Sequence, residues 1–247
     1  MSKDNITNSP VLNVIEYFES WQGEGPNQGK LATFIRFPKC NLNCPFCDTK
    51  EKMKVSNQKP VCIEDILVSI SRTNYLVITG GEPTLKDYIQ PIINVLSLLK
   101  RVKDLIIGIE TNGSNLSRFL SEFIDTIKDP KFNLEIYWSP KICRNKDDIT
   151  AFANTRIFFL QTLYCITDIV QKLDNVDLFI KTVIDDYIDY DFILSCAKSK
   201  LHSHNLYVMP QGVTKQEIFD NCVKAMEVAK KYGTNISTRA HILGLFE

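Results

Sequence analysis

Three closely spaced cysteines are the residues whose chemistry can be stated first. The stretch Cys40-Asn-Leu-Asn-Cys44-Pro-Phe-Cys47 follows an apolar run at 31–37. Thiols this close in sequence can converge on one metal centre, but no fourth cysteine or histidine is near, and Cys62 is the nearest candidate. Structural zinc sites and [4Fe–4S] clusters both normally take four protein ligands. Three thiolates therefore favour a cluster with one open iron, and a zinc site or redox thiols remain as alternatives.

Other polar motifs follow other strand-like runs. They are Thr79-Gly80-Gly81-Glu82-Pro83, Glu110-Thr111-Asn112-Gly113, Ser139-Pro140-Lys141 and Met209-Pro210-Gln211. In isolation, tight turns and helix caps explain such motifs. The carboxyl ends of parallel strands meet at one edge, however, so a parallel sheet would bring these motifs to the cysteines.

Short apolar runs alternate with helical periods, which indicates parallel strands joined by crossover helices. The predicted strands are 31–37, 75–79, 104–110, 133–138, 177–184, 205–209 and a final one near 235–240. The clearest predicted helices are Ile63–Ser71, Asp87–Leu99, Tyr187–Ser199 and Lys215–Tyr232, the last ending at Gly233. Six βα units are too few for a closed eight-stranded barrel. We expect an α/β fold, a partial (open) (β/α)6 TIM-like barrel.

The composition predicts a single domain over 1–247. Of the 247 residues, 44% are hydrophobic and 23% charged, as in ordinary globular domains. Residues 143–174 form an insertion without an assignment, in which we expect Thr155–Val170 to be a strand plus a helix on the outside.

The charge balance and the apolar runs limit the partners that we expect. Lys plus Arg equals Asp plus Glu, 29 against 29, so net charge does not argue for a nucleic-acid or membrane partner. No apolar run predicts a signal peptide or a membrane span. We expect a soluble, cytoplasmic protein.

The cysteine motif, with Phe46 before its last cysteine, resembles the signature of radical S-adenosylmethionine (SAM) enzymes. The resemblance implies a [4Fe–4S] cluster on Cys40, Cys44 and Cys47, whose open iron is chelated by SAM. It also implies a set of SAM-binding residues at the strand ends: Phe46, Cys47, Asp48, Gly81, Glu82, Thr111, Ser139, Pro140, Lys141, Met209, Pro210 and Gln211.

A second set of motifs makes the resemblance more specific. Glu19-Ser-Trp-Gln22-Gly-Glu24-Gly25, then Phe34-Ile-Arg36, then Asp48-Thr49 after the last cysteine resemble the 7-carboxy-7-deazaguanine synthase family, from about residue 13 onward. That family converts 6-carboxy-5,6,7,8-tetrahydropterin to 7-carboxy-7-deazaguanine with loss of ammonia, as a carbon–nitrogen lyase on the route to queuosine and related deazapurines.

The same resemblance implies the remaining cofactors and partners. It implies Mg²⁺ on Thr49, an electron donor such as flavodoxin or ferredoxin, a homodimer, and no catalytic side chain beyond the cofactor-derived radical. The implied substrate contacts, beginning in an N-terminal segment over 1–30, are Trp21, Gln22, Gly23, Glu24, Arg36, Thr79, His241 and Glu247.

These residue types suit a pterin carboxylate. Gln22 and Glu24 can read a ring edge rich in donors and acceptors, and Arg36 can bind a carboxylate as a fork. Thr49, with Asp48 beside it, offers the oxygen ligands that Mg²⁺ prefers, although an Asp-Thr pair is also a common helix cap. The simplest alternative for Glu24 and Arg36 is a salt bridge between them.

The end of the chain carries a further expectation. His241 lies in the segment that would close over the substrate, with the terminal carboxylate of Glu247 reaching it; a frayed tail is the alternative.

Two competing functions share parts of these motifs. A radical SAM activase of a glycyl-radical enzyme has the cysteine loop but no evident use for the Gln-Gly-Glu-Gly run with Arg36. A non-catalytic iron–sulfur or zinc module would need the cysteines alone.

Overall fold

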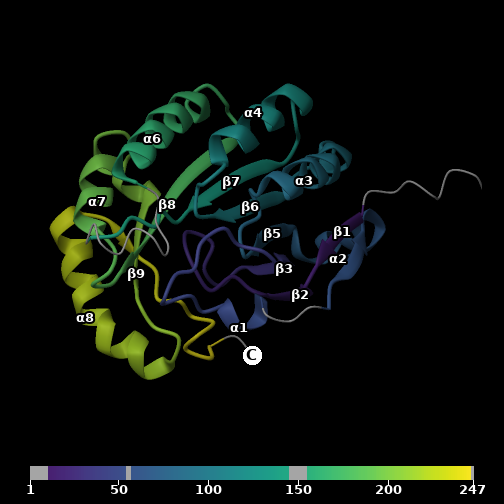
Figure 1. The fold of residues 1–247 in the computed structure, drawn as a ribbon. Helices are drawn as coiled ribbons and strands as arrows, with labels where there is room; N and C mark the ends of the chain where they lie inside the picture. Colours follow the sequence, from purple (N-terminus) through teal and green to yellow (C-terminus); the bar gives the residue numbers. More distant parts are fainter. Residues whose placement is uncertain (1–10, 54–56, 145–154, 246–247) are drawn as a thin grey trace, which may run out of the picture.

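The computed structural model describes residues 11–53, 57–144 and 155–245, which build an eight-stranded sheet with helices outside it (Figure 1). The strand order is β10-β9-β8-β7-β6-β5-β3-β2. All neighbours pair in parallel except β2 with β3. The strands are β2 (Glu16–Trp21), β3 (Leu31–Phe37), β5 (Tyr75–Gly80), β6 (Ile106–Thr111), β7 (Asn133–Trp138), β8 (Val176–Ile184), β9 (Leu206–Pro210) and β10 (Asn235–Ile236).

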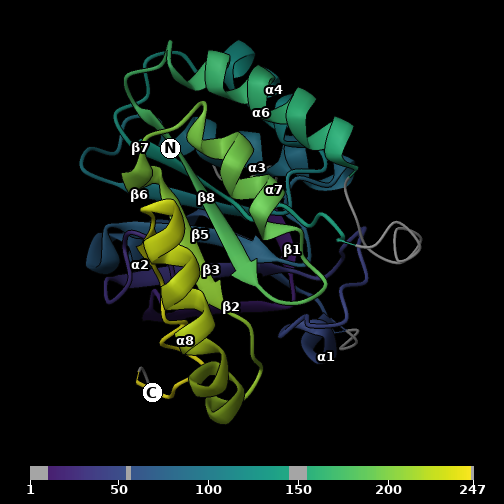
Figure 2. The same cartoon turned by 90° about the vertical axis from the view of Figure 1, so that its left-hand side faces the viewer.

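Helices cover the outer face of this curved sheet (Figures 1 and 2). They are α2 (Ile63–Thr73), α3 (Lys86–Leu99), α4 (Leu116–Thr126), α6 (Arg156–Val170), α7 (Tyr190–Lys198) and α8 (Lys215–Tyr232), with a short 3₁₀ turn η3 (Ser203–Asn205). The short helix α1 (Lys50–Met53) follows the cysteine loop and buries none of its residues. The parallel strands from β3 to β9 are each followed by helix, and the sheet ends at β2 and β10 without closing. The predicted open α/β barrel is confirmed. No helix in the described part of the chain is long and apolar enough to cross a membrane.

Apolar side chains on both faces of the strands explain why the sheet is buried. Along β5, Leu76 and Ile78 belong to the core under the helices, whereas Tyr75 and Val77 belong to a second cluster on the inner face. A strand buried on both faces has a continuous apolar run instead of an alternating pattern. The Tyr75 and Tyr137 hydroxyls lie 2.9 Å apart inside this inner cluster, so one end of the barrel interior is filled.

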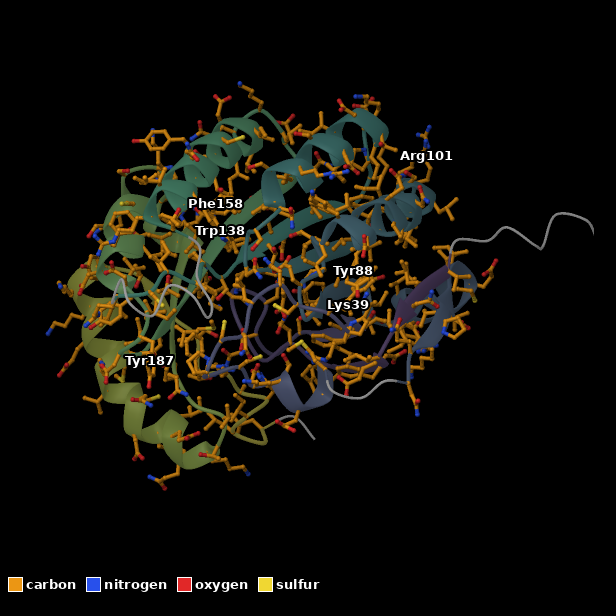
Figure 3. All side chains as sticks on the ribbon, viewed as in Figure 1. Lys39, Tyr88, Arg101, Trp138, Phe158 and Tyr187 are labelled. Atoms are coloured by element: carbon orange, nitrogen blue, oxygen red, sulfur yellow. The ribbon has the colours of Figure 1, made fainter. Side chains whose placement is uncertain are left out.

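Trp138 ties the ends of two central strands together. Its indole N–H donates to the carbonyl of Asn112 at 3.0 Å, and its ring lies 5.0 Å from that of Phe159. Figure 3 marks Trp138 on the side of the sheet that α6 covers. The loops after β6 and β7 are thereby held at the same edge.

Three parts of the sequence-based prediction need correction. Thr155–Val170 contains no strand: Thr155 caps α6, its side chain accepting from the amide of Phe158, and the helix begins at Arg156. The pairing of β1 (Val11–Val14) with β4 (Lys59–Cys62) in a separate antiparallel sheet was not predicted, nor was strand β2.

The last strand is also shorter than 235–240. The amide of Ser237 still donates to Val208 O at 2.9 Å, but the amide of Ala240 donates to Gly23 O at 2.9 Å. The chain therefore leaves the sheet after Ile236 and binds the loop that follows β2. This crossing brings the C-terminal segment to the cysteine edge.

Candidate active site

A cavity of about 460 Å³ opens at the carboxyl ends of the parallel strands. It collects most of the residues that the sequence singled out, from segments far apart along the chain. Those that line it are Trp21, Gln22, Gly23, Glu24, Arg36, Cys40, Cys44, Phe46, Cys47, Asp48, Thr49, Thr79, Gly81, Thr111, Ser139, Lys141, Met209 and His241. Glu82, Pro140, Pro210 and Gln211 do not line it, and Glu247 lies outside the described residues.

The cysteine loop begins where β3 ends. The amide of Leu42 donates to Cys40 Sγ at 3.4 Å, and the amide of Cys47 donates to Cys44 O at 3.3 Å. Burial raises the pKa of Cys44 to about 11, and the neighbouring Cys40 and Cys47 thiols push it the same way. Burial and mutual repulsion disfavour three deprotonated thiolates side by side, so a bound cation is needed to keep all three thiols deprotonated.

The spacing of the sulfur atoms bears on which metal fits. Among the described residues, the one triad of candidate ligand atoms within 4.8 Å of one another is Glu24, Asp48 and His241, so the three cysteine sulfurs are spread more widely. Zinc–sulfur bonds of 2.3 Å in a tetrahedron would bring the sulfurs to about 3.8 Å. In a cluster each thiolate binds a different iron, so the wider spacing suits a cluster better than zinc. Cys62 is not part of the site, because its thiol donates to Asp65 Oδ2 at 2.9 Å outside the cavity lining.

Gly81, directly after β5, packs against the start of the cysteine loop. A Cβ on Gly81 would lie 2.1 Å from the carbonyl oxygen of Lys39. The amides of Gly81 and Glu82 donate to Phe37 O at 2.9 Å and to Lys39 O at 2.8 Å. Only a residue without a side chain allows the two backbones to pass this closely.

Glu82 lies fully buried behind this contact. Its carboxylate accepts from Thr111 Oγ1 at 2.6 Å, from the amide of Asn112 at 2.6 Å and from Thr84 Oγ1 at 2.5 Å. Burial raises the pKa of Glu82, and these hydrogen bonds oppose the shift. Glu82 thus ties the loop after β5 to the loop after β6, and a direct contact with a cofactor stays a prediction.

A chain of alternating charges crosses one wall of the cavity. Lys181 Nζ lies 3.1 Å from Glu110 Oε1 and 2.9 Å from Glu24 Oε2. Arg239 Nε lies 3.1 Å from Glu24 Oε1, and its Nη2 pairs with Asp48. Although burial alone would raise it, Lys181 and Arg239 hold the pKa of Glu24 well below its usual range. We call Glu24, Glu110, Lys181 and Arg239 the Glu24 wall. Its side chains are ionised and pair with one another.

Three members of this wall were missing from the sequence-based site: Lys181, Glu110 and Arg239. Lys181 had a signal, since it is a charged residue that directly follows the apolar run Leu178–Ile180 of β8; the structure leaves it only 3% exposed. Glu110 ends β6 beside Thr111, where a turn explained it equally well. Arg239 had no signal, because its partners come from distant segments.

Arg36 and Glu24 do not pair with each other, so the simple salt-bridge alternative is wrong. Arg36 Nε donates to Glu16 Oε2 at 2.5 Å, and Lys52 Nζ also reaches Glu16 at 3.2 Å. Both Arg36 and Glu24 line the cavity from different sides of the sheet edge, where they can meet a ligand.

A comparison with protein families assigns this architecture. The Radical SAM superfamily matches residues 34–139, which include the cysteine loop and the strand ends up to Ser139. Over this stretch the chain is similar to the radical SAM superfamily.

Several curated proteins that are similar to the chain share one name. The chain is 41% identical over 105 residues to the 7-carboxy-7-deazaguanine synthase of Hyperthermus butylicus, covering 42% of this chain and 43% of that protein. It is 37% identical over 150 residues to the synthase of Clostridium acetobutylicum, covering 56% and 66%. It is 25% identical over 257 residues to that of Halobacterium salinarum, covering 96% and 92%. The matches to the first two relatives thus span from under half to just under two thirds of their length.

A solved structure has a similar fold. The crystal structure of QueE from Escherichia coli aligns with a TM-score of 0.57 at 19% identity, covering 96% of this chain and 98% of that one. The alignment therefore spans nearly the whole length of both chains.

Proposed function

We propose that the protein converts 6-carboxy-5,6,7,8-tetrahydropterin to 7-carboxy-7-deazaguanine with loss of ammonia, as a radical SAM lyase of 7-deazapurine biosynthesis. One observation carries this proposal. The three cysteines share a cavity with Gln22, Arg36 and the Glu24 wall. An activase or an electron-transfer module would not need a preorganised set of acceptors and an arginine beside its cluster.

The cofactors would occupy the part of the cavity nearest the cysteine loop. When bound, a [4Fe–4S] cluster and SAM would supply a 5′-deoxyadenosyl radical that removes a hydrogen atom from the substrate. Burial lowers the pKa of Lys141, and its Nζ donates to Ser139 Oγ. A carboxylate of the cofactor would offset the unfavourable burial of the Lys141 ammonium. Thr111, Phe46 and Met209 are further cavity-lining residues that we assign to SAM.

The substrate would lie against the Glu24 wall. Gln22 Nε2 donates to Glu110 Oε1 at 3.3 Å, and the amide of Glu24 donates to Gln22 Oε1 at 3.1 Å. These hydrogen bonds hold the Gln22 and Glu110 side chains in place before a ligand binds. Less conformational entropy is then lost on binding. We assign Thr79, whose hydroxyl donates to Glu110 Oε2 at 2.7 Å, and His241 to the same subsite.

Mg²⁺ would bind at Thr49, whose hydroxyl lies 3.4 Å from Cys47 Sγ. The nearby triad of Glu24, Asp48 and His241 is a poorer cation site, because Arg239 already pairs with both carboxylates. A metal there would have to displace a buried guanidinium. Thr49 offers a neutral oxygen, and Mg²⁺ commonly completes such a site with water and substrate oxygens.

Electrons would reach the cluster from the outside of the cysteine loop. A shallow surface pocket of about 390 Å³ includes Cys40 and is flanked by Lys39 and Lys50. Cys40 lines both this pocket and the large cavity, and Figure 3 places Lys39 near Tyr88 of α3. We propose an acidic carrier such as flavodoxin or ferredoxin as the donor, since two lysines favour a negative surface. A homodimer is likewise proposed.

Anaerobic reconstitution with iron and sulfide, followed by spectroscopy and a SAM-cleavage assay with the pterin, tests the function. We expect the brown cluster spectrum, 5′-deoxyadenosine and 7-carboxy-7-deazaguanine. A colourless zinc protein would remove the radical assignment. A cluster that cleaves SAM without using the pterin would favour the activase.

Replacing Arg36 by alanine should raise the KM for the pterin about 10- to 100-fold with SAM binding changed little, because a lost charge-assisted bond to a carboxylate costs about 1.5–3 kcal/mol. Steady-state kinetics and SAM calorimetry measure the two effects. Arg72→Ala is the matched control, since Arg72 pairs with Glu19 on the neighbouring strand and is 55% exposed. Equal weakening of both ligands would mean that Arg36 only braces Glu16.

Replacing Gly23 by alanine should displace His241. A Cβ at this position would lie 2.2 Å from His241 Nδ1 and 2.8 Å from its Cγ, so the imidazole must move away. We expect the KM for the pterin to rise about tenfold, as for one lost hydrogen bond. Gly29→Ala is the control: its Cβ meets nothing within 4 Å but its φ is +86°, so it should lower stability without changing that KM. An unchanged KM in Gly23→Ala would remove His241 from the substrate subsite.

A further inference from the structure

Arg239 has an unusual backbone conformation for its residue type. Its φ is 55°, in the left-handed region that non-glycine residues rarely adopt, and it is 6% exposed. Such conformations persist where surrounding contacts impose them, and they gather at functional sites. In Arg239 the contacts that impose the positive φ are made by its side chain.

The guanidinium of Arg239 joins three separate segments. Nε donates to Glu24 Oε1 at 3.1 Å, Nη1 donates to Gly212 O at 2.7 Å, and Nη2 donates to Asp48 Oδ2. Although burial alone would lower it, the Glu24 and Asp48 carboxylates raise the pKa of Arg239. A planar fork with separate N–H donors can hold three acceptors at once, which lysine cannot do in the same geometry.

The two carboxylates that Arg239 holds come from different segments of the chain that both line the cavity. Glu24 lies on the wall assigned to the substrate, whereas Asp48 directly follows Cys47 of the cysteine loop. The backbone on either side of Arg239 is also fixed, since Ala240 N donates to Gly23 O and Ile242 N to Arg239 O, each at 2.9 Å. Glu24 and Asp48 therefore cannot shift independently while Arg239 stays in place.

We propose that Arg239 is a positioning residue that couples the substrate wall to the cysteine loop, so that occupancy at Glu24 and occupancy beside Cys47 strengthen each other. This proposal rests on the proposed function for the identity of the two ligands. The coupling is reciprocal, because each ligand stabilises the same arrangement of one shared network.

Arg239→Gly in the reconstituted holoenzyme isolates the guanidinium, because glycine accepts the positive φ without strain. We expect kcat/KM for the pterin to fall about 10- to 100-fold, as when one partner of a buried charge pair is removed. More 5′-deoxyadenosine should be released per product. Millimolar guanidinium chloride should restore part of the loss and sodium chloride should not. Arg118→Gln is the control, since Arg118 forms an exposed pair with Glu122 on α4.

Hydrogen exchange of the same holoenzymes provides a readout independent of turnover. In Arg239→Gly, the backbone amides of segments 22–30 and 40–53 should both exchange about tenfold faster, because the free energy of local opening falls in both segments. Faster exchange confined to 237–245, or no restoration by guanidinium, would overturn the coupling. If the wild type binds SAM but does not convert the pterin, the proposed function fails, and the exchange comparison still decides the role of Arg239.

Discussion

An alanine in place of Cys44 is expected to abolish the cluster absorbance and 5′-deoxyadenosine formation together. Cys44 is 8% exposed and shares the cavity with Cys40 and Cys47, which are the other cysteines among the described residues that line it. A cluster held by three thiolates already has one iron without a protein ligand. Without Cys44 a second iron would lack one, and the two remaining thiolates cannot retain the cluster. Iron and sulfide analysis, the absorbance spectrum and SAM cleavage are measured on the same sample.

Cys165 and Cys196 supply the control for this loss. Neither lines the cavity, and both lie on outer helices, α6 and α7. Cys165→Ala and Cys196→Ala should keep the full cluster and full SAM cleavage. Retained cleavage in Cys44→Ala, with the spectrum unchanged, would contradict the cluster assignment and reopen the redox-thiol alternative.

Replacing Lys181 by methionine is expected to destabilise the fold more than any other change in the charged wall. Glu110 loses its partner at 3.1 Å, and Glu24 loses one at 2.9 Å while keeping Arg239. Removing one partner of a buried ion pair typically costs about 3–5 kcal/mol, because a buried charge is left without compensation. For a chain of this size that corresponds to a Tm lower by roughly 6–20 °C. Thermal unfolding at pH 7 measures it.

The pH dependence separates this electrostatic cause from lost packing. In the wild type the lowered pKa of Glu24 adds stability above about pH 4.5 that is lost as pH falls through the folded-state value. The Glu24 and Glu110 carboxylates raise the pKa of Lys181 in spite of burial, so its contribution is full below 10.5 and is lost as pH rises through the higher folded value.

In Lys181→Met the Glu24 carboxylate loses one of the two main cations that lower its pKa, so Glu24 protonates at a higher pH in the folded variant than in the wild type. The deficit in stability relative to wild type should therefore shrink as pH falls from 7 to 4. The control is Lys224→Met, which breaks an exposed pair with Asp186 and should change stability by less than about 0.5 kcal/mol. A deficit that is the same at both pH values would point to packing instead of charge.

Local patterns in the sequence specify the α/β alternation, the open sheet and the group of cavity-lining motifs. Strand β7 and helix α8 have the predicted bounds, and Gly233 ends α8 with a positive φ of 62°. These features depend on local periodicity and capping, which neighbouring residues encode. The cysteine loop was also readable, because its spacing is itself local.

The pairing of the charged side chains depends on the folded structure. Lys181, Glu24, Arg239 and Asp48 come from segments up to 215 residues apart, and no local pattern specifies which carboxylate meets which cation. The structure replaced a pairing of Arg36 with Glu24 by Arg36 with Glu16, from the adjacent strand β2. It also turned a strand predicted near 235–240 into a segment bound to the 22–28 loop, because the hydrogen-bond partners of Thr238 and Ala240 lie in that loop. Such contacts join segments that are distant in the sequence, and they form only because the complete fold brings those segments together.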